Sequence, residues 1–554
     1  MHEPSRRSEV AAWTLELPDA EVEQDPVLLR ARSFAQVEGG RFDLGVSDAE
    51  RAFSLAQAQG DPVEAADAGM DVAYALRERT NWQASGEWLA KLDQFPLTPA
   101  QRLRWLNMKV VEAVSHRRDF MAARALHSEV EDLALKVGDT MALLTSVINR
   151  ALGVERLTGR YDRMAEAAAA IERTHGGQVP AEDEHFRRRI LALIAFDTGE
   201  RVEDSLTRLS ELGDRASIAY ADAMLALWLA SSGRCKEAQE ASERALRSAY
   251  PGNVVLLMAR LARAHVHALQ DRGNEAAVTI GEIDWAEEEP AWRMVGLIEA
   301  ARIERAAGRA ELAQELAGQA IALAVDHRSP FLELRGRAVM DTMRVEVKNL
   351  ARVVELAGMM NYGEALARRD PVEAATSFGH AIARGLAVDQ ASKWSKTSGV
   401  TARVVRLIGP ISVVVGGRLL ERSDWVRPRA RTLFAYLAYH DRPVQVQRVL
   451  DDLWTGMEEG AAKKSLKVAC SYIRRAFGED VVEWSAQTLR LVLEEPYWID
   501  VHDLRRASRS SDPDLRRRVL AETGGCRPLE DLNEPWAEDA RTEVAALIAR
   551  LQNR

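Results

Sequence analysis

Cationic and hydroxyl side chains gather between residues 461 and 477, near the C-terminal end of the chain. Their spacing predicts one helix with two different faces. Apolar residues recur at i, i+4, i+7 and i+11 and should enter a core: Ala462, Leu466, Ala469, Cys470, Ile473, Ala476 and Phe477. The opposite face presents Lys463, Lys464, Lys467, Ser471, Tyr472, Arg474 and Arg475. No acidic residue occurs from 461 to 478, so this face should attract an anion.

A basic helix of this size can enter the major groove of B-DNA. Lysine and arginine would bind phosphates and release counterions, and one or two of them could contact guanine edges. Taken alone, the pattern also permits a charged face that meets only solvent. The neighbouring elements favour the DNA-binding interpretation, because two shorter helices precede this one and a hairpin follows it.

The surrounding sequence predicts the elements that would position the basic helix. β-Branched runs at 404–408 and 411–415 predict two strands. Apolar stripes predict helices over 427–440 and 444–454, followed by a loop at 455–460. After the basic helix, strands are expected at 481–484 and 489–493 around a turn at 485–488. Strands, three helices and a terminal hairpin together describe a winged helix.

The stretch Ala462–Phe477 resembles the recognition helix of OmpR-type winged helices, in the form found in SARP-type transcriptional regulators. The family pattern is roughly A-R-x-x-L-x-V-x-x-S-x-L-R-R-A-L. The residues that match it or replace it conservatively are Ala462, Lys463, Leu466, Val468, Ser471, Ile473, Arg474, Arg475, Ala476 and Phe477. Leu407–Pro410 is similar to the opening LLGP of the family, and Leu453-Trp454 to the LW that ends its second helix.

The resemblance continues into the last residues. Asp500–Leu504 looks like the start of the bacterial transcriptional activation domain (BTAD), and Pro528–Leu532 with Trp536 and Arg541 looks like a later motif of that domain. The resemblance covers about 404–545. It implies a bacterial regulator that binds double-stranded DNA and contacts RNA polymerase, with a homodimer bound to direct repeats.

Two departures from the family pattern bear on these implications. The wing usually carries Gly-Tyr, where this chain has Leu489-Arg490, so Arg490 becomes the expected phosphate contact of the wing. The activation domain usually continues through many more helices, whereas only residues 500–554 follow here. We therefore expect a truncated BTAD-like segment whose part in dimer or polymerase contacts is open.

The first 388 residues carry a recurring turn between amphipathic helical stretches. The turns are expected at 39–41, 80–82, 118–120, 158–161, 198–200, 232–234, 271–273, 307–309 and 369–371. Most are about 34 to 41 residues apart, which is typical of helix–turn–helix arrays. Units such as 219–253, with Gly233-Arg234 between two helices and Pro251 after them, resemble tetratricopeptide (TPR) repeats. Such an array offers a concave groove for a peptide or protein, and nothing singles out contact residues within it.

The expected fold is mainly α: a TPR-like α-solenoid, then a winged-helix (α+β) DNA-binding domain, then a short helical tail. The boundaries follow from composition and periodicity. They are an N-terminal segment at 1–23, the repeat array at 24–388, a polar linker at 389–402, the winged helix at 403–499 and the BTAD-like segment at 500–554.

Composition and motif searches argue against several other classes of protein. The net charge of −10 disfavours a protein that coats nucleic acid indiscriminately. The N-terminus lacks the apolar core of a signal peptide, and no window suits a bilayer span, so we expect a cytoplasmic protein without membrane contact. The three cysteines, Cys235, Cys470 and Cys526, form no CxxC pair.

Enzymatic motifs are also missing from the sequence. There is no GxxxxGK[ST], HExxH or GxSxG, and 456–465 has the wrong spacing for a phosphate-binding loop. His185 among acidic neighbours is expected to lie at a solvated helix start. We expect no enzyme, no cofactor and no metal; a redox role for Cys470 is the weak alternative. The functional alternative is a TPR scaffold whose winged helix contacts proteins instead of DNA.

Overall fold

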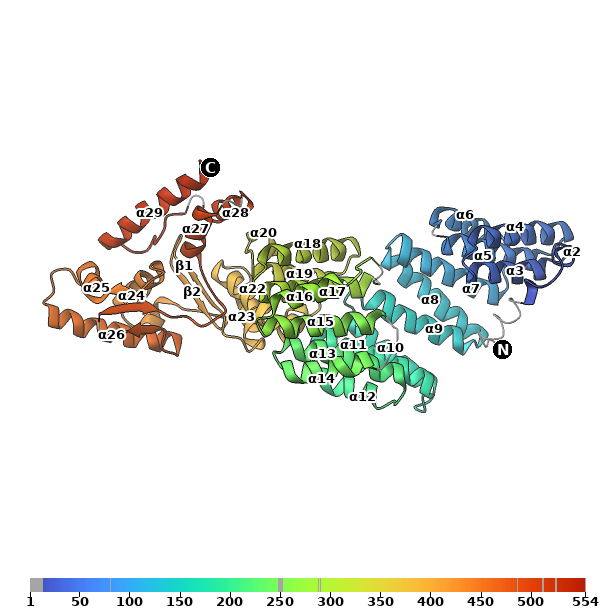
Figure 1. Cartoon of the computed structure of the whole chain (residues 1–554), viewed down its shortest axis with the longest axis horizontal. Helices are drawn as coiled ribbons and strands as arrows, with labels where there is room; N and C mark the ends of the chain where they lie inside the picture. Colours follow the sequence, from blue (N-terminus) through green and yellow to red (C-terminus); the bar gives the residue numbers. More distant parts are fainter. Residues whose placement is uncertain are drawn as a thin grey trace. The chain divides into compact units, whose positions relative to one another are not determined.

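The computed structural model describes residues 13–553 except 80, 248–252, 287, 289, 486, 511–512 and 524–525. Residues 1–12 of the expected N-terminal segment, Thr80 of one expected turn, and Pro251 of the best-formed expected repeat therefore lie outside the described residues. The chain is mainly helical, which confirms the predicted class at this level (Figure 1). It divides into two compact units: unit 1 is Met1–Leu191 with Asp326–Arg328, and unit 2 is Ala192–Val325 with Ser329–Arg554.

Unit 1 is built from helices that pack against their neighbours in sequence, such as α3 on α4 and α4 on α5. Aspartate or asparagine begins several of them; Asp25, for example, accepts hydrogen bonds from the backbone N–H of Val27 at 2.8 Å, which satisfies a donor that the first turn leaves free. Its helices are α2 (Asp19–Val22), α3 (Pro26–Glu38), α4 (Phe42–Gln59), α5 (Pro62–Glu78), α6 (Trp82–Leu92), α7 (Pro99–Val111), η1 (Glu112–His116), α8 (Phe120–Val137), α9 (Thr140–Arg150), η2 (Ala151–Glu155), α10 (Tyr161–Thr174) and the start of α11 (Ala181–Thr198).

The helical part of unit 2 continues the helix–turn–helix pattern. The predicted turns at 232–234 and 307–309 separate consecutive helices, and Gly233 (φ 75°) and Gly308 (φ 77°) take the left-handed conformation that ends a helix. The helices are α12 (Val202–Ser210), α13 (Arg215–Ser231), α14 (Cys235–Arg247), α15 (Asn253–Leu269), α16 (Gly273–Gly281), α17 (Pro290–Ala306), α18 (Ala310–Asp326), α19 (Pro330–Asp341), α20 (Val347–Gly358), α21 (Tyr362–Arg369), α22 (Pro371–Ala383) and α23 (Val388–Thr397).

A buried ion-pair network joins α17, α19, α21 and α22. Its members are almost completely withdrawn from solvent: Glu299, Arg302, Arg335, Arg369, Asp370 and Glu373. Arg335 donates to Asp370 at 2.6 Å and to Glu299 at 2.8 Å. The Arg369 guanidinium also donates to Glu299, at 2.9 Å. Each buried carboxylate thus meets guanidinium groups from other helices, which offsets the cost of burying charge.

The expected linker at 389–402 is wrong in its first part, because residues Val388–Thr397 form helix α23. The segment is polar in composition, but it has three residues at helical spacing that are buried: Ala391, Trp394 and Ser395. The Trp394 ring packs on Phe378 of α22, with 5.1 Å between centroids. The side chain of Ser392 donates to the carbonyl of Gly417 and so ties α23 to the sheet that follows.

Two small sheets follow. The first has the order β3-β2-β1-β7, with β1 (Arg403–Arg406), β2 (Ser412–Val415) and β3 (Arg418–Leu419) antiparallel. Strand β7 (Tyr497–Ile499), which the sequence analysis did not predict, pairs in parallel with β1, placing Val404 opposite Trp498. The second sheet has the order β4-β6-β5, from β4 (Val444–Gln445), β5 (Val482–Trp484) and β6 (Thr488–Leu491).

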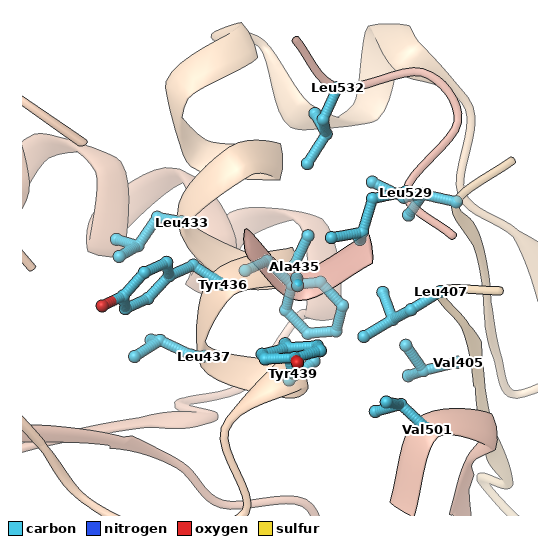
Figure 2. Close-up of a cluster of buried hydrophobic side chains, with 14 of the residues drawn as sticks. Val405, Leu407, Leu433, Ala435, Tyr436, Leu437, Tyr439, Val501, Leu529 and Leu532 are labelled. Carbon is cyan, nitrogen blue, oxygen red and sulfur yellow. The ribbon is translucent and has the colours of Figure 1, made fainter. Parts of the chain in front are cut away.

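Three helices lie between β3 and β5 in sequence: α24 (Pro428–Tyr439), α25 (Val446–Leu453) and α26 (Glu459–Phe477), preceded by the short η3 (Arg422–Trp425). The helix predicted at 444–454 begins at Val446, two residues after the predicted start, because Val444 and Gln445 pair with β6 as strand β4. Figure 2 shows Ala435 and Tyr439 of α24 on the side of Leu407 and Leu529, whereas Leu433 and Tyr436 point to the other side of the helix; all of them belong to one buried cluster.

The last helices share this core. They are α27 (Asp500–Arg509), α28 (Pro513–Thr523) and α29 (Pro535–Gln552). The Trp536 ring meets Tyr436 edge-on with centroids 5.0 Å apart, and Arg541 donates to the Leu529 carbonyl at 2.7 Å. Residues after 500 therefore complete one continuous hydrophobic core with residues 405–499.

Candidate nucleic-acid interface

Helix α26 carries seven of the eight side chains that the sequence analysis selected. It begins at Glu459, two residues before the predicted start, because the Glu458 carboxylate accepts from the backbone N–H groups of Gly460 and Ala461, each at 2.9 Å. Gly478, with φ 79°, ends the helix where predicted. The N-terminal carboxylates also suit the positive end of the helix dipole.

The predicted inward face of α26 enters the core. Its buried members are Ala462, Leu466, Ala469, Ile473, Ala476 and Phe477. Phe477 packs against Phe434 of α24 with 5.0 Å between ring centroids, and Trp454 Nε1 donates to Ser465 Oγ at 2.8 Å. These contacts fix the rotation of α26 about its axis, so they decide which side chains face outward.

The outward face holds most of the selected cations. Exposed side chains include Lys463, Lys464, Lys467, Ser471, Arg474 and Arg475. Tyr472 differs, because its ring is half-buried and packs against the core. A half-buried tyrosine can still present its hydroxyl, but it adds less to an exposed binding surface than the sequence suggested.

Three of the selected cations already have carboxylate partners. Lys463 Nζ lies 2.5 Å from Glu459, and Arg474 lies 2.8 Å from Asp480. On the hairpin, Arg490 stands directly opposite Glu483 in the β5–β6 register, with 2.5 Å between charged atoms. All three carboxylates fall outside 461–478, the range in which the sequence showed no acidic residue. Pairs this exposed are weak and easily exchanged for phosphate.

Three cations on α26 remain available. Among the residues that the structure describes, Lys464, Lys467 and Arg475 have no ion-pair partner. They are spaced three and eight residues apart, so they follow one side of the helix over about three turns. This row, Lys464, Lys467 and Arg475, is called the free cationic row below.

The sequence analysis did not select Val468 as a contact residue, yet it lies on the outward face. Its side chain is 47% exposed, although an apolar residue in this helix would ordinarily be buried. It follows Lys464 by four positions, so it borders the free cationic row. The sequence did contain a signal for this, because a helical wheel places Val468 on the polar side of the helix. In a DNA groove, such a residue suits contact with a thymine methyl group.

Cys470 is not placed for redox chemistry. Its side chain is half-buried against the core, and burial raises the pKa of the thiol to about 12. The thiolate, which is the reactive form, is therefore scarce near neutral pH. Of the expected wing turn at 485–488, Ala486 lies outside the described residues.

Two searches of the described residues bear on other classes of site. No group of three or more His, Cys, Asp or Glu side chains among them is arranged to hold a metal ion. Within the same residues, every helix is too short or too polar to cross a bilayer.

Comparisons with known proteins add little. No family model and no curated protein matches the chain. Among solved structures, a chain of "Structure of Naa15/Naa10 bound to HypK-THB" is 14% identical, with 99% of this chain and 90% of that chain covered and a TM-score of 0.17. A likeness this weak carries no argument about the fold or the function of the chain.

Proposed function

We propose that the chain is a sequence-specific DNA-binding transcriptional regulator, similar to SARP/BTAD-type proteins, with α26 as the helix that enters the major groove. The observation that carries the proposal is the free cationic row on a helix whose opposite face is locked into a core. Preorganised cations on a rigid helix bind phosphates without first breaking an internal pair.

The elements around α26 support a winged helix of the OmpR type. Strands β1, β2 and β3 precede three helices, the β5–β6 hairpin follows the third helix, and β7 returns to complete the four-stranded sheet. Strand β4 between α24 and α25 joins that hairpin into a three-stranded sheet, which braces it beside α26. In this arrangement the hairpin supplies Arg490 as a second, weaker phosphate contact.

The helical pairs before residue 388 support a TPR-like array that docks a peptide or protein. Their turns recur where the repeat pattern places them, at 198–200, 232–234 and 307–309, for example. Under this proposal the array receives a protein signal, and the chain recruits RNA polymerase and binds direct repeats as a homodimer.

The test is capture of genomic DNA fragments by the full chain, followed by salt titration of the enriched fragment. A protein that neutralises several phosphates loses affinity steeply with salt, by roughly 0.9 in log K per phosphate and per unit of log salt. The double variant Lys464→Ala/Lys467→Ala should lose binding and lower this slope. Lys236→Ala, which removes an exposed lysine from α14, is the matched control.

A scaffold whose C-terminal part contacts proteins is the second candidate. The observation that favours it is the neutralised hairpin, where Arg490 and Glu483 offset each other. Recovery of no enriched fragment, or binding that does not change with salt, would support the scaffold and contradict the proposed regulator.

A further inference from the structure

A cavity of about 590 Å³ lies in unit 2, between the last helical pairs and the four-stranded sheet. Its walls come from α17, α19 and α22 with the segment after α19 on one side, and from β1, β7 and α27 on the other. Helix α22 packs directly on β1, so these walls belong to one packed body. The volume lies within the range of sites that hold small organic molecules.

One wall of the cavity contains a buried carboxyl group whose hydrogen-bonding capacity is only partly used. Asp341, at the end of α19, is 1% exposed, and its Oδ1 accepts from Asn349 Nδ2 at 2.7 Å. Among the described residues, its Oδ2 makes no hydrogen bond of ordinary length, and the buried Ser377 hydroxyl of α22, which interacts with this carboxyl, makes none either. Burial raises the pKa of the Asp341 carboxyl to about 7, because loss of water outweighs the opposing effects of the Asn349 and Ser377 side chains and of the Arg384 and Arg337 charges. A buried polar atom left in this condition costs free energy that a donor from outside would recover.

The arginines that line the cavity, in contrast, already form ion pairs with carboxylates. Arg305 lies 2.8 Å from Glu373, the Arg403 Nε donates to Glu479 at 2.7 Å, and Arg506 pairs with Asp503. An anionic ligand would have to displace one of these carboxylates. A ligand with an ammonium group would instead meet the Asp341 carboxyl, which forms no ion pair with the described residues.

Apolar and aromatic side chains form much of the remaining lining, beside the polar Thr342, Thr376 and Glu495. Trp498 of β7 meets the His380 ring edge-on with 4.6 Å between centroids, and Tyr497, Val372 and Ile499 line the same space. Burial holds the pKa of His380 well below its usual range, so this imidazole is neutral at physiological pH. Neutral rings and aliphatic side chains suit the body of an aromatic or aliphatic amine.

We infer that this cavity binds a small organic amine, whose ammonium group pairs with Asp341 and whose apolar body lies against Trp498, Tyr497 and Val372. Such a ligand would touch α19 and α22 on one side and β7 on the other. It would therefore stabilise the packing of the last helical pairs on the sheet. This inference is independent of DNA binding, since every contact that it invokes lies away from α26.

Calorimetric titration of the full chain with tryptamine tests the inference, with indole-3-acetate as the probe of similar shape and opposite charge. We expect saturable binding of tryptamine and at least tenfold weaker binding of indole-3-acetate. Asp341→Asn should weaken tryptamine binding at least tenfold, whereas Asp389→Asn, which changes an exposed aspartate on α23, should leave it unchanged.

Val372→Phe supplies an independent variant, because it narrows the cavity without altering any charge. It should also weaken tryptamine binding, with the helical circular dichroism of the chain retained. Equal affinity for the two probes, no binding of tryptamine at millimolar concentration, or binding that survives both Asp341→Asn and Val372→Phe would overturn the inference.

Discussion

Unit 2 uses arginine and acidic residues in two opposite ways, in the buried ion-pair network and on the exposed face of α26. In the network, Arg335 is fully buried and pairs with Glu299 of α17 and with Asp370, which lies between α21 and α22. On α26, Arg474 is 60% exposed and has one carboxylate partner, while the free cationic row has none among the described residues. The comparison teaches that burial, and not residue type, separates charges that hold a fold together from charges that can meet a ligand.

Removing one member of the buried network should have the largest effect on stability. Arg335→Ala leaves Glu299 and Asp370 buried without a principal partner and should lower the free energy of unfolding by about 3–5 kcal/mol. Urea unfolding measures the loss. Arg208→Ala, at a position 67% exposed in its pair with Asp204, should change stability by no more than about 0.5 kcal/mol. Equal effects of the two substitutions would contradict the distinction drawn above.

Asp341 extends the comparison to a buried acid that forms no ion pair within the described part of the chain. Its pKa is raised from 3.8 to about 7, so its contribution to stability is present below pH 3.8 and is lost as the pH rises towards 7. Asp341→Asn does not ionise, so its stability relative to the wild type should increase between pH 4 and pH 8, by about 4 kcal/mol. Thermal unfolding of both proteins across this range measures the difference. A pH-independent difference would mean that Asp341 is ionised in the folded protein.

Within the exposed face, the free cationic row should matter more than the paired cations. Lys467→Ala should weaken binding to the enriched DNA fragment by about 1–3 kcal/mol if it contacts a base edge, and should lower the salt slope by about 1 if it contacts a phosphate. Arg474→Ala should cost less, since Asp480 already offsets part of its charge. Fluorescence anisotropy at several salt concentrations separates these outcomes. A larger loss for Arg474 would reverse the order proposed here.

The smallest effect should come from releasing a paired cation. Asp480→Asn frees Arg474 and removes a negative charge near the DNA, so affinity should rise by less than about 1 kcal/mol. The gain should shrink as salt is added, because screening weakens exposed charges. Anisotropy at low and high salt gives the measurement, and unchanged stability of the variant serves as its control. A decrease in affinity would place Asp480 in a different role.

The sequence predicted most of α26 because one helix contains its own pattern. The inward residues from Ala462 to Phe477 recur at helical spacing, and Gly478 marks the end. The sequence pattern did not reveal the carboxylates that pair with Lys463, Arg474 and Arg490, since these lie just outside 461–478. It also missed Val468, whose outward position depends on how the core fixes the rotation of the helix.

Strands β4 and β7 and helix α23 were missed for a related reason. Two or three residues, such as Val444-Gln445 or Tyr497–Ile499, are too short to show a period, and they become strands only when β6 or β1 supplies a partner. Helix α23 looks polar in sequence, but Ala391 and Trp394 find a buried place against α22 and the sheet. Its helical state therefore depends on packing more than on its own composition.

By itself, the sequence determined the mainly helical class, the recurring turns and the two faces of the basic helix, because hydrophobic periodicity and glycine conformation act over a few neighbouring residues. Only the tertiary structure decided which charges are buried together and which remain free. Glu299 and Arg369 are 70 residues apart in the chain, yet they lie 2.9 Å apart in the fold. The cavity beside Asp341 arises in the same way, from segments that only folding brings together, and no local pattern encodes their proximity.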